Sequence, residues 1–197
     1  MLDRFGFGRG LSDDDLRLPP SNDFEPVARH LTETVSALKA IADNPPGKAP
    51  SGLMGPFYRM IRRGGLKRIN AAIEAAGELQ DDLATVVAGG EEADPCLRED
   101  VRRRLEDARP TLRKGLDSLI SYHAVLLDDS GMADSLRTLS RRLMVSINSV
   151  TEERFNFGAV LDWVEDGKKP DVKLLPPPSA DDCRKAKGEP PRKMATP

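Results

Sequence analysis

The chain has few of the side chains that most often carry enzyme chemistry. Its 197 residues include two histidines, two cysteines and one tryptophan, and aromatic residues make up 5% of the sequence. The motifs of zinc proteases, phosphate-binding loops and serine hydrolases (HExxH, GxxxxGKS/T and GxSxG) do not occur in it. We therefore expect a protein that is not an enzyme, with no cofactor and no small-molecule substrate.

The cysteines and the charge balance exclude further classes. Cys96 and Cys183 lie far apart, without the CxxC or Cys/His spacing of a zinc site, and predict no disulfide framework. No run approaches the eighteen apolar residues of a transmembrane helix, and residues 1–10 lack the apolar core of a signal peptide. The cytoplasm is the expected location. A net charge of −2 restricts any electrostatic role to a local patch.

What the sequence does have is apolar residues at helical spacing. Residues 97–127 and 132–164 each repeat an apolar residue every three or four positions, which predicts a long helical hairpin with a turn at 128–131. Asp94–Pro95 is typical of a helix start, and Pro110 predicts a kink. The two stripes consist of Leu97, Val101, Leu105, Ala108, Leu112, Leu116, Leu119 and Leu126, then Met132, Leu136, Leu139, Leu143, Ile147, Val150, Phe157, Leu161 and Val164.

Shorter patterns complete the predicted fold. Gly64–Gly65 is expected to be a hinge between a short helix at 53–63 and a longer helix. The fold class is all-α: an antiparallel bundle with a central helical hairpin, one short extra helix and disordered termini. Its four main helices are predicted at 26–43, 66–88, 97–127 and 132–164. The expected parts of the chain are a flexible arm (1–22), a helical bundle domain (23–166) and a disordered, proline-rich, basic tail (167–197).

Polar residues that interrupt the hairpin are predicted to be structural. His123 falls at a core position of the first stripe, and Arg154 continues the second, where its stem would pack and its head would stay in water. The run Arg102–Arg104 has acidic residues three and four positions away, so we expect a solvated charged face. His123 and Arg154 would lie about four helical turns apart, too far to form a catalytic pair.

The most distinctive segment is 44–73, which contains no acidic residue. An aromatic helix flanked by arginines is typical of a membrane-interface segment, of a phosphate-backbone binder with a base stacked on an aromatic ring, or of a protein contact. It also suits a capping helix whose arginines are solvated or paired. The candidate binding residues are Lys48, Phe57, Tyr58, Arg59, Arg62, Arg63, Lys67 and Arg68. The helix that follows is basic at its start and acidic later, which opposes the helix dipole.

The leading hypothesis is a non-enzymatic interaction or assembly protein. It would bind protein partners, including a second copy of itself, through a bundle face and the proline-rich tail, since polyproline segments are pre-ordered for binding. The alternative is a peripheral binder of anionic membranes or nucleic acid that acts through residues 48–68.

Overall fold

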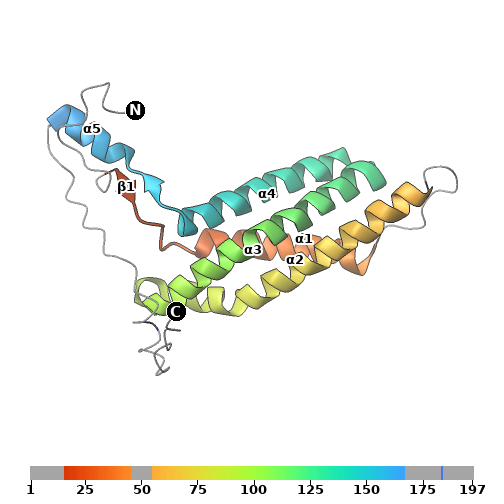
Figure 1. Ribbon diagram of the computed structural model, residues 1–197, viewed down its shortest axis with the longest axis horizontal. Coiled ribbons are helices and arrows are strands. Elements are labelled where there is room, and N and C mark those ends of the chain that lie inside the picture. Colours follow the sequence, from red (N-terminus) through yellow and green to blue (C-terminus); the bar gives the residue numbers. More distant parts are fainter. Residues whose placement is uncertain (1–15, 46–54, 167–182, 184–197) are drawn as a thin grey trace, which may run out of the picture. The chain divides into compact units, whose positions relative to one another are not determined.

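The computed structural model describes residues 16–45, 55–166 and Cys183. The chain is all-α, as predicted, and its strands are limited to two short segments in the described part (Figure 1). Residues 22–151 form one compact unit, and residues 16–21 with 152–166 belong to another. The helices are α1 (Glu25–Asp43), α2 (Gly55–Gly89), α3 (Pro95–Ser121), α4 (Ser130–Thr151) and α5 (Phe157–Asp166).

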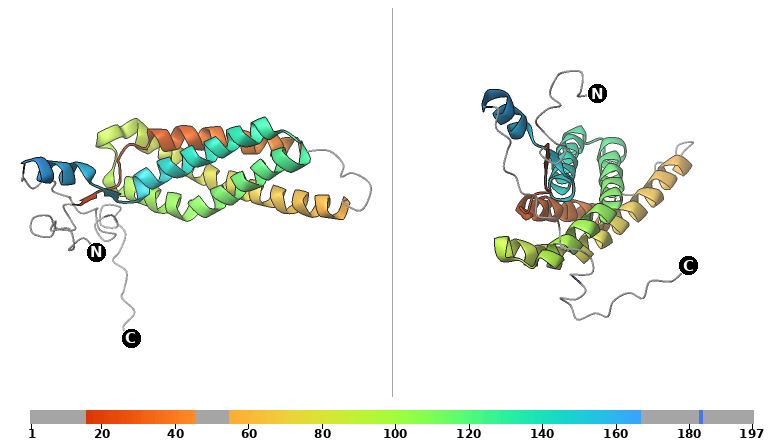
Figure 2. Two further views of the ribbon diagram at one scale, coloured as in Figure 1. Left: turned by 90° about the horizontal axis from the view of Figure 1, so that it is seen from above. Right: turned by 60° about the vertical axis from the view of Figure 1, so that its left-hand side comes forward.

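Helices α1 to α4 form a four-helix bundle. Each of α1 and α3 packs against both α2 and α4, so the four helices surround one core (Figure 2). Apolar residues at three- and four-residue spacing on each helix supply that core, because this spacing places them on a single face. The largest fully buried apolar side chains are those of Phe24, Leu31, Leu38, Ile69, Leu79, Leu83, Leu105, Leu112, Leu116, Leu119, Tyr122 and Leu143.

Small residues set the close contact between α2 and α3. Gly115 of α3 lies directly against Ala72 of α2, and a Cβ atom built on Gly115 overlaps the Ala72 methyl group. That Cβ position is also 3.3 Å from the carbonyl oxygen of Arg68. The missing side chain at Gly115 therefore allows the two helices to approach more closely than larger residues permit.

The predicted break at Gly64–Gly65 is wrong. Helix α2 continues through both glycines for 35 residues, so the expected helices at 53–63 and 66–88 are one. Gly65 is needed for packing instead: a Cβ atom there overlaps the ring of Tyr122, whereas Gly64 faces open space. The close approach of a buried aromatic ring accounts for a glycine that costs helix stability on its own.

The second arm of the hairpin also ends earlier than predicted. Helix α4 stops at Thr151, and Arg154, expected on the edge of a helical stripe, lies exposed in strand β2 (Arg154–Phe155). Strand β2 pairs antiparallel with β1 (Arg17–Leu18). The apolar stripe has no member in the helical turn between Val150 and Phe157. A helix continued through this turn would therefore bury no apolar side chain there.

The first arm ends in a wider turn than predicted. After Ser121 the helix passes into a π-helical segment, η4 (Tyr122–Leu126), in which the amide of Leu127 donates to the carbonyl of Tyr122 at 3.1 Å. The extra residue per turn changes the phase of the stripe. His123, expected in the core, is therefore only partly buried, with Nδ1 3.6 Å from a carboxylate oxygen of Asp129.

The cysteines differ from expectation as well. Cys96 and Cys183 are each disulfide-bonded, and the chain has no free thiol. The expectation of reduced cysteines without a disulfide framework is therefore wrong. Among the residues described, no helix combines the length and the hydrophobicity that crossing a bilayer requires.

Candidate interaction surfaces

The predicted binding residues divide between α2 and the segment before it. Lys48 lies outside the described residues. Phe57 and Tyr58 lie in the first turns of α2, but their side chains are also outside the described part. The aromatic half of the predicted site therefore stays a prediction. The cations are described: Arg62 is half-buried, and the exposed ones are Arg59, Arg63, Lys67 and Arg68.

Three of these cations form a basic stripe along α2. Arg59, Arg63 and Lys67 follow one another at four-residue spacing, which places them on one face of the helix. This face is opposite the buried Ile69 and Ala72. Within the described part of the chain, no ion pair joins the three cations to an acidic side chain. Their charge is open to a partner.

The same face becomes acidic in the second half of α2. Glu74, Glu78 and Asp81 are exposed and form an acidic stripe that continues the line of the basic stripe. Neighbours at four-residue spacing, such as Arg63 and Lys67 or Glu74 and Glu78, carry like charges, and each such pair costs about 0.2–0.5 kcal/mol. The basic stripe, which begins near the N-terminal end of α2, also opposes the helix dipole. The outer face of α2 is thus electrostatically unfavourable in the isolated bundle.

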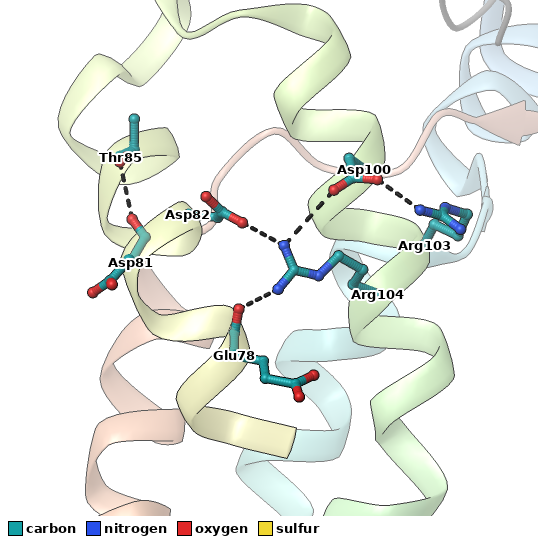
Figure 3. Close-up of polar contacts among 7 residues, drawn as sticks. All are labelled: Glu78, Asp81, Asp82, Thr85, Asp100, Arg103 and Arg104. Carbon is teal, nitrogen blue, oxygen red and sulfur yellow. Dashed lines mark hydrogen bonds and ion pairs between the residues drawn. The ribbon is translucent and has the colours of Figure 1, made fainter. Parts of the chain in front are cut away.

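An arginine of α3 fastens the acidic half of α2 to the bundle. Arg104 donates to the carboxylate of Asp82 and to the carbonyl of Glu78, and it lies 3.7 Å from Asp100 on its own helix (Figure 3). Its neighbour Arg103 pairs with Asp100 at 2.7 Å and is exposed. The carboxylate of Asp82 therefore takes part in holding α2 against α3, whereas the carboxylates of the acidic stripe beside it do not.

Arg102 makes a second link between helices. Its Nε donates to the carbonyl of Val150 at 2.8 Å, in the last turn of α4, and its guanidinium lies 5.4 Å from the ring centre of Phe24. Another nitrogen donates to the side chain of Asn22. The prediction of a solvated face is thus wrong for Arg102 and Arg104, which are partly buried and also have partners outside α3. The predicted local pairs, Arg102 with Glu99 and Arg104 with Asp100, do form.

The largest difference from the sequence prediction concerns the end of the second apolar stripe. Phe157, Leu161 and Val164, expected in the core, are 72%, 59% and 58% exposed on α5. Phe155 in β2 is also exposed, and its ring meets that of Phe157 edge to face at 4.8 Å between centroids. These four residues form an apolar ridge. Sequence periodicity identified an apolar face here but could not show that it is left uncovered.

Helix α5 has a defined start that positions this ridge. The side chain of Asn156 is buried, and its Oδ1 accepts a hydrogen bond from the amide of Ala159 at 3.1 Å, which is an N-cap. The amide of Asn156 in turn donates to the carbonyl of Leu16 at 2.9 Å. Ala159, on the other side of α5, is buried. The ridge is thus the outward face of an anchored helix.

A groove on the surface of α3 and α4 has fewer features of a functional site than the two surfaces described above. It has a volume of about 390 Å³ and is lined by Glu106, Arg109, Pro110, Arg113, Met144 and Asn148. Arg109 donates to the side-chain oxygen of Asn148 at 2.9 Å across it. In the described residues, no cluster of histidine, cysteine and acidic side chains is arranged to hold a metal ion. The groove has no nucleophile beside a base, so it is not a catalytic arrangement.

The two histidines and a buried tyrosine complete the titratable groups of interest. His30 Nδ1 lies 3.4 Å from the hydroxyl of Ser146, and burial, Arg29 and Arg142 lower its pKa against the opposing effect of Glu33. Burial likewise raises the pKa of Tyr122. Among the described contacts, His30 lies within hydrogen-bond distance of one nucleophile, the Ser146 hydroxyl, and His123 lies within that distance of none.

Comparison with protein families, curated proteins and solved structures gives no match to the chain.

Proposed function

We propose that this protein is a non-enzymatic interaction protein whose helical bundle is a scaffold and whose apolar ridge on α5 binds a protein partner. The observation that carries the proposal is the exposure of Phe155, Phe157, Leu161 and Val164 side by side. Large aromatic and aliphatic side chains that stay exposed in a contiguous patch are typical of binding sites.

The form of the ridge indicates how it binds. Residues 157, 161 and 164 follow the i, i+4, i+7 spacing by which an amphipathic helix fills an apolar groove. The sequence of α5 contains three acidic residues and no basic one. An anionic membrane is therefore disfavoured as the target, and a protein groove with an apolar floor and a basic rim is favoured. The proline-rich tail, which apart from Cys183 lies outside the described residues, is the second contact in this proposal.

The ridge is tested by capturing partners from the native cell. The double variant Phe157→Ala/Leu161→Ala removes the two central anchors. The loss of each anchor should weaken binding by about 1–2 kcal/mol, which is roughly a tenfold loss of affinity per residue. Val145→Ala is the matched control, since Val145 is 69% exposed on α4, outside the ridge. Quantitative mass spectrometry of captured proteins should show a partner lost with the double variant and kept with the control. Equal capture by both variants would contradict the proposal.

The basic stripe of α2 supports a second candidate, the binding of an anionic membrane or nucleic acid. The observation in its favour is that Arg59, Arg63 and Lys67 are exposed without an acidic partner in the described part of the chain. Vesicle flotation and a DNA mobility shift, each at low and high salt, test it with the triple variant in which these residues are changed to glutamate. Wild-type protein that binds neither probe would remove this candidate.

The cytoplasm remains the proposed location, and the state of the cysteines tests it. Disulfides persist in oxidising compartments and are rare in a reducing cytoplasm. A reducing cytoplasm would open the disulfide bonds that the structure has at Cys96 and Cys183, so in cells quenched rapidly with acid both cysteines should react with an alkylating reagent before any reductant is added. Recovery of the disulfide from such cells would place the protein in an oxidising compartment.

A further inference from the structure

We propose that two copies of this chain associate through the outer faces of α2, packed antiparallel about a two-fold axis. The inference uses the basic and acidic stripes of α2 and does not depend on the apolar ridge of α5. The partner is a second copy of the chain because this face is basic in its first half and acidic in its second half. An antiparallel copy therefore places its acidic half against the basic half of the first.

The register follows from the residue numbers. A two-fold axis that crosses α2 between Asn70 and Ala71 brings Lys67 opposite Glu74 of the second copy, since both lie the same distance from the axis. At 1.5 Å rise per residue that distance is roughly 5 Å. The same axis brings Arg63 opposite Glu78 of the second copy. Symmetry repeats each pair, so the interface contains four ion pairs from these residues.

The residues at the axis permit this approach. Asn70 and Ala71, the two residues nearest the axis, are exposed and have short side chains. Packed helices lie about 8–10 Å apart, at a distance set by the side chains at the contact, so short residues at the crossing allow a close approach. The centre of the charge pattern therefore coincides with a pair of short, exposed residues of α2.

Association also relieves both unfavourable features of the isolated helix. Like charges that follow one another along α2 face opposite charges on the second copy, and the two helix dipoles run in opposite directions. A nucleic acid or an anionic membrane lying along this face would meet the acidic stripe as well as the basic one. A partner with the reversed charge order satisfies both stripes, and a second antiparallel α2 has that order.

Sedimentation equilibrium of the full chain tests the proposal. We expect a monomer–dimer equilibrium whose dissociation constant rises at least about tenfold between about 50 mM and 500 mM salt, because exposed ion pairs are screened. Arg63→Glu/Lys67→Glu reverses the two basic residues that pair across the axis, and Glu74→Lys/Glu78→Lys reverses the two acidic residues that pair with them. Each variant alone should dimerise at least about tenfold more weakly than wild type, because like charges then meet across the axis.

The decisive arm is an equimolar mixture of these two variants. In a mixed pair the reversed residues of one variant meet residues of opposite charge on the other, so the mixture should dimerise more strongly than either variant alone. Lys39→Glu/Arg141→Glu is the matched control, because both residues are exposed cations on other helices, and it should dimerise as wild type does. Circular dichroism establishes that each variant is folded.

Three results would overturn the inference. The first is wild-type protein that stays monomeric at high micromolar concentration in low salt. The second is a folded Glu74→Lys/Glu78→Lys variant that dimerises as well as wild type, which would mean that the acidic stripe takes no part. The third is a mixture of the two folded variants that remains monomeric, which would exclude the antiparallel register.

Discussion

The ring of Tyr122 lies against Gly65, and its hydroxyl donates a hydrogen bond to the carbonyl oxygen of Arg62. Tyr122 is fully buried at the point where α3 passes into η4, so this contact fastens the end of α3 to the first half of α2. It holds in place the stretch of α2 that bears the basic stripe. The positions of Arg59, Arg63 and Lys67 thus depend on a glycine that the sequence suggested was a hinge.

The first prediction separates packing from flexibility at this glycine pair. Gly65→Ala should destabilise the protein by about 1–2 kcal/mol, because the overlap with Tyr122 costs more than the gain in helix propensity. Gly64→Ala should stabilise it by up to about 1 kcal/mol, since a Cβ atom there meets nothing within 4 Å. Urea unfolding measures both. Equal effects of the two substitutions would indicate a hinge and contradict the packing role.

The sequence was sufficient wherever one local rule decided the structure. Leu112, Leu116 and Leu119 occur at core spacing and are fully buried, and Asp94 accepts a hydrogen bond from the amide of Cys96 at the predicted start of α3. The rule for glycine failed at Gly65 because Tyr122, 57 positions later, decides the outcome. Local charge spacing identified the pairs of Arg102 with Glu99 and of Arg104 with Asp100. It could not identify their further partners, Val150 and Asp82, which are remote in sequence.

The candidate surfaces were harder to predict than the fold. An apolar stripe such as Phe157, Leu161 and Val164 has the same sequence pattern whether or not another helix covers it. Periodicity identifies the apolar face of a helix but not the element that packs against that face. The exposure of these three side chains follows from the end of α4 at Thr151 and from the N-cap at Asn156, neither of which was predicted from the sequence. An asparagine two positions before a glycine, after a skipped turn of the stripe, was the available signal.

The second prediction concerns the α2–α3 clamp. Arg104→Ala should lower the free energy of unfolding by about 1–3 kcal/mol, because a partly buried guanidinium with three polar partners is lost. Arg103→Ala should change it by less than about 1 kcal/mol, since that residue makes an exposed pair with Asp100. A double-mutant cycle of Arg104 with Asp82 isolates the interhelical pair. No coupling in that cycle would show that the clamp contributes nothing.

The third prediction is a pH dependence centred on His30. Burial, then Arg29, lowers the pKa of His30 from its ordinary value of 6.5, and Arg142 acts in the same direction. Below pH 6.5 the unfolded chain therefore binds more protons at this site than the folded chain, and the free energy of unfolding falls as the pH falls. His30→Gln removes this component. The difference in unfolding free energy between wild type and variant should change between about pH 7.5 and pH 5. A constant difference across this range would contradict the assignment.

The last prediction connects the Asn156 cap to the apolar ridge. Asn156→Ala removes the hydrogen bond to the Ala159 amide and should destabilise α5 by about 0.5–2 kcal/mol, which is roughly two- to thirtyfold in the opening equilibrium of its first turn. Hydrogen exchange at the Ala159 amide should accelerate by that factor. Asn156→Asp is the control, because aspartate caps a helix about as well as asparagine, and it should restore protection. Capture of a partner through Phe157 and Leu161 should weaken with the alanine variant and recover with the aspartate variant, since an ordered helix keeps the two anchors at binding distance from each other. Unchanged exchange at Ala159 in the alanine variant would show that the cap does not hold α5.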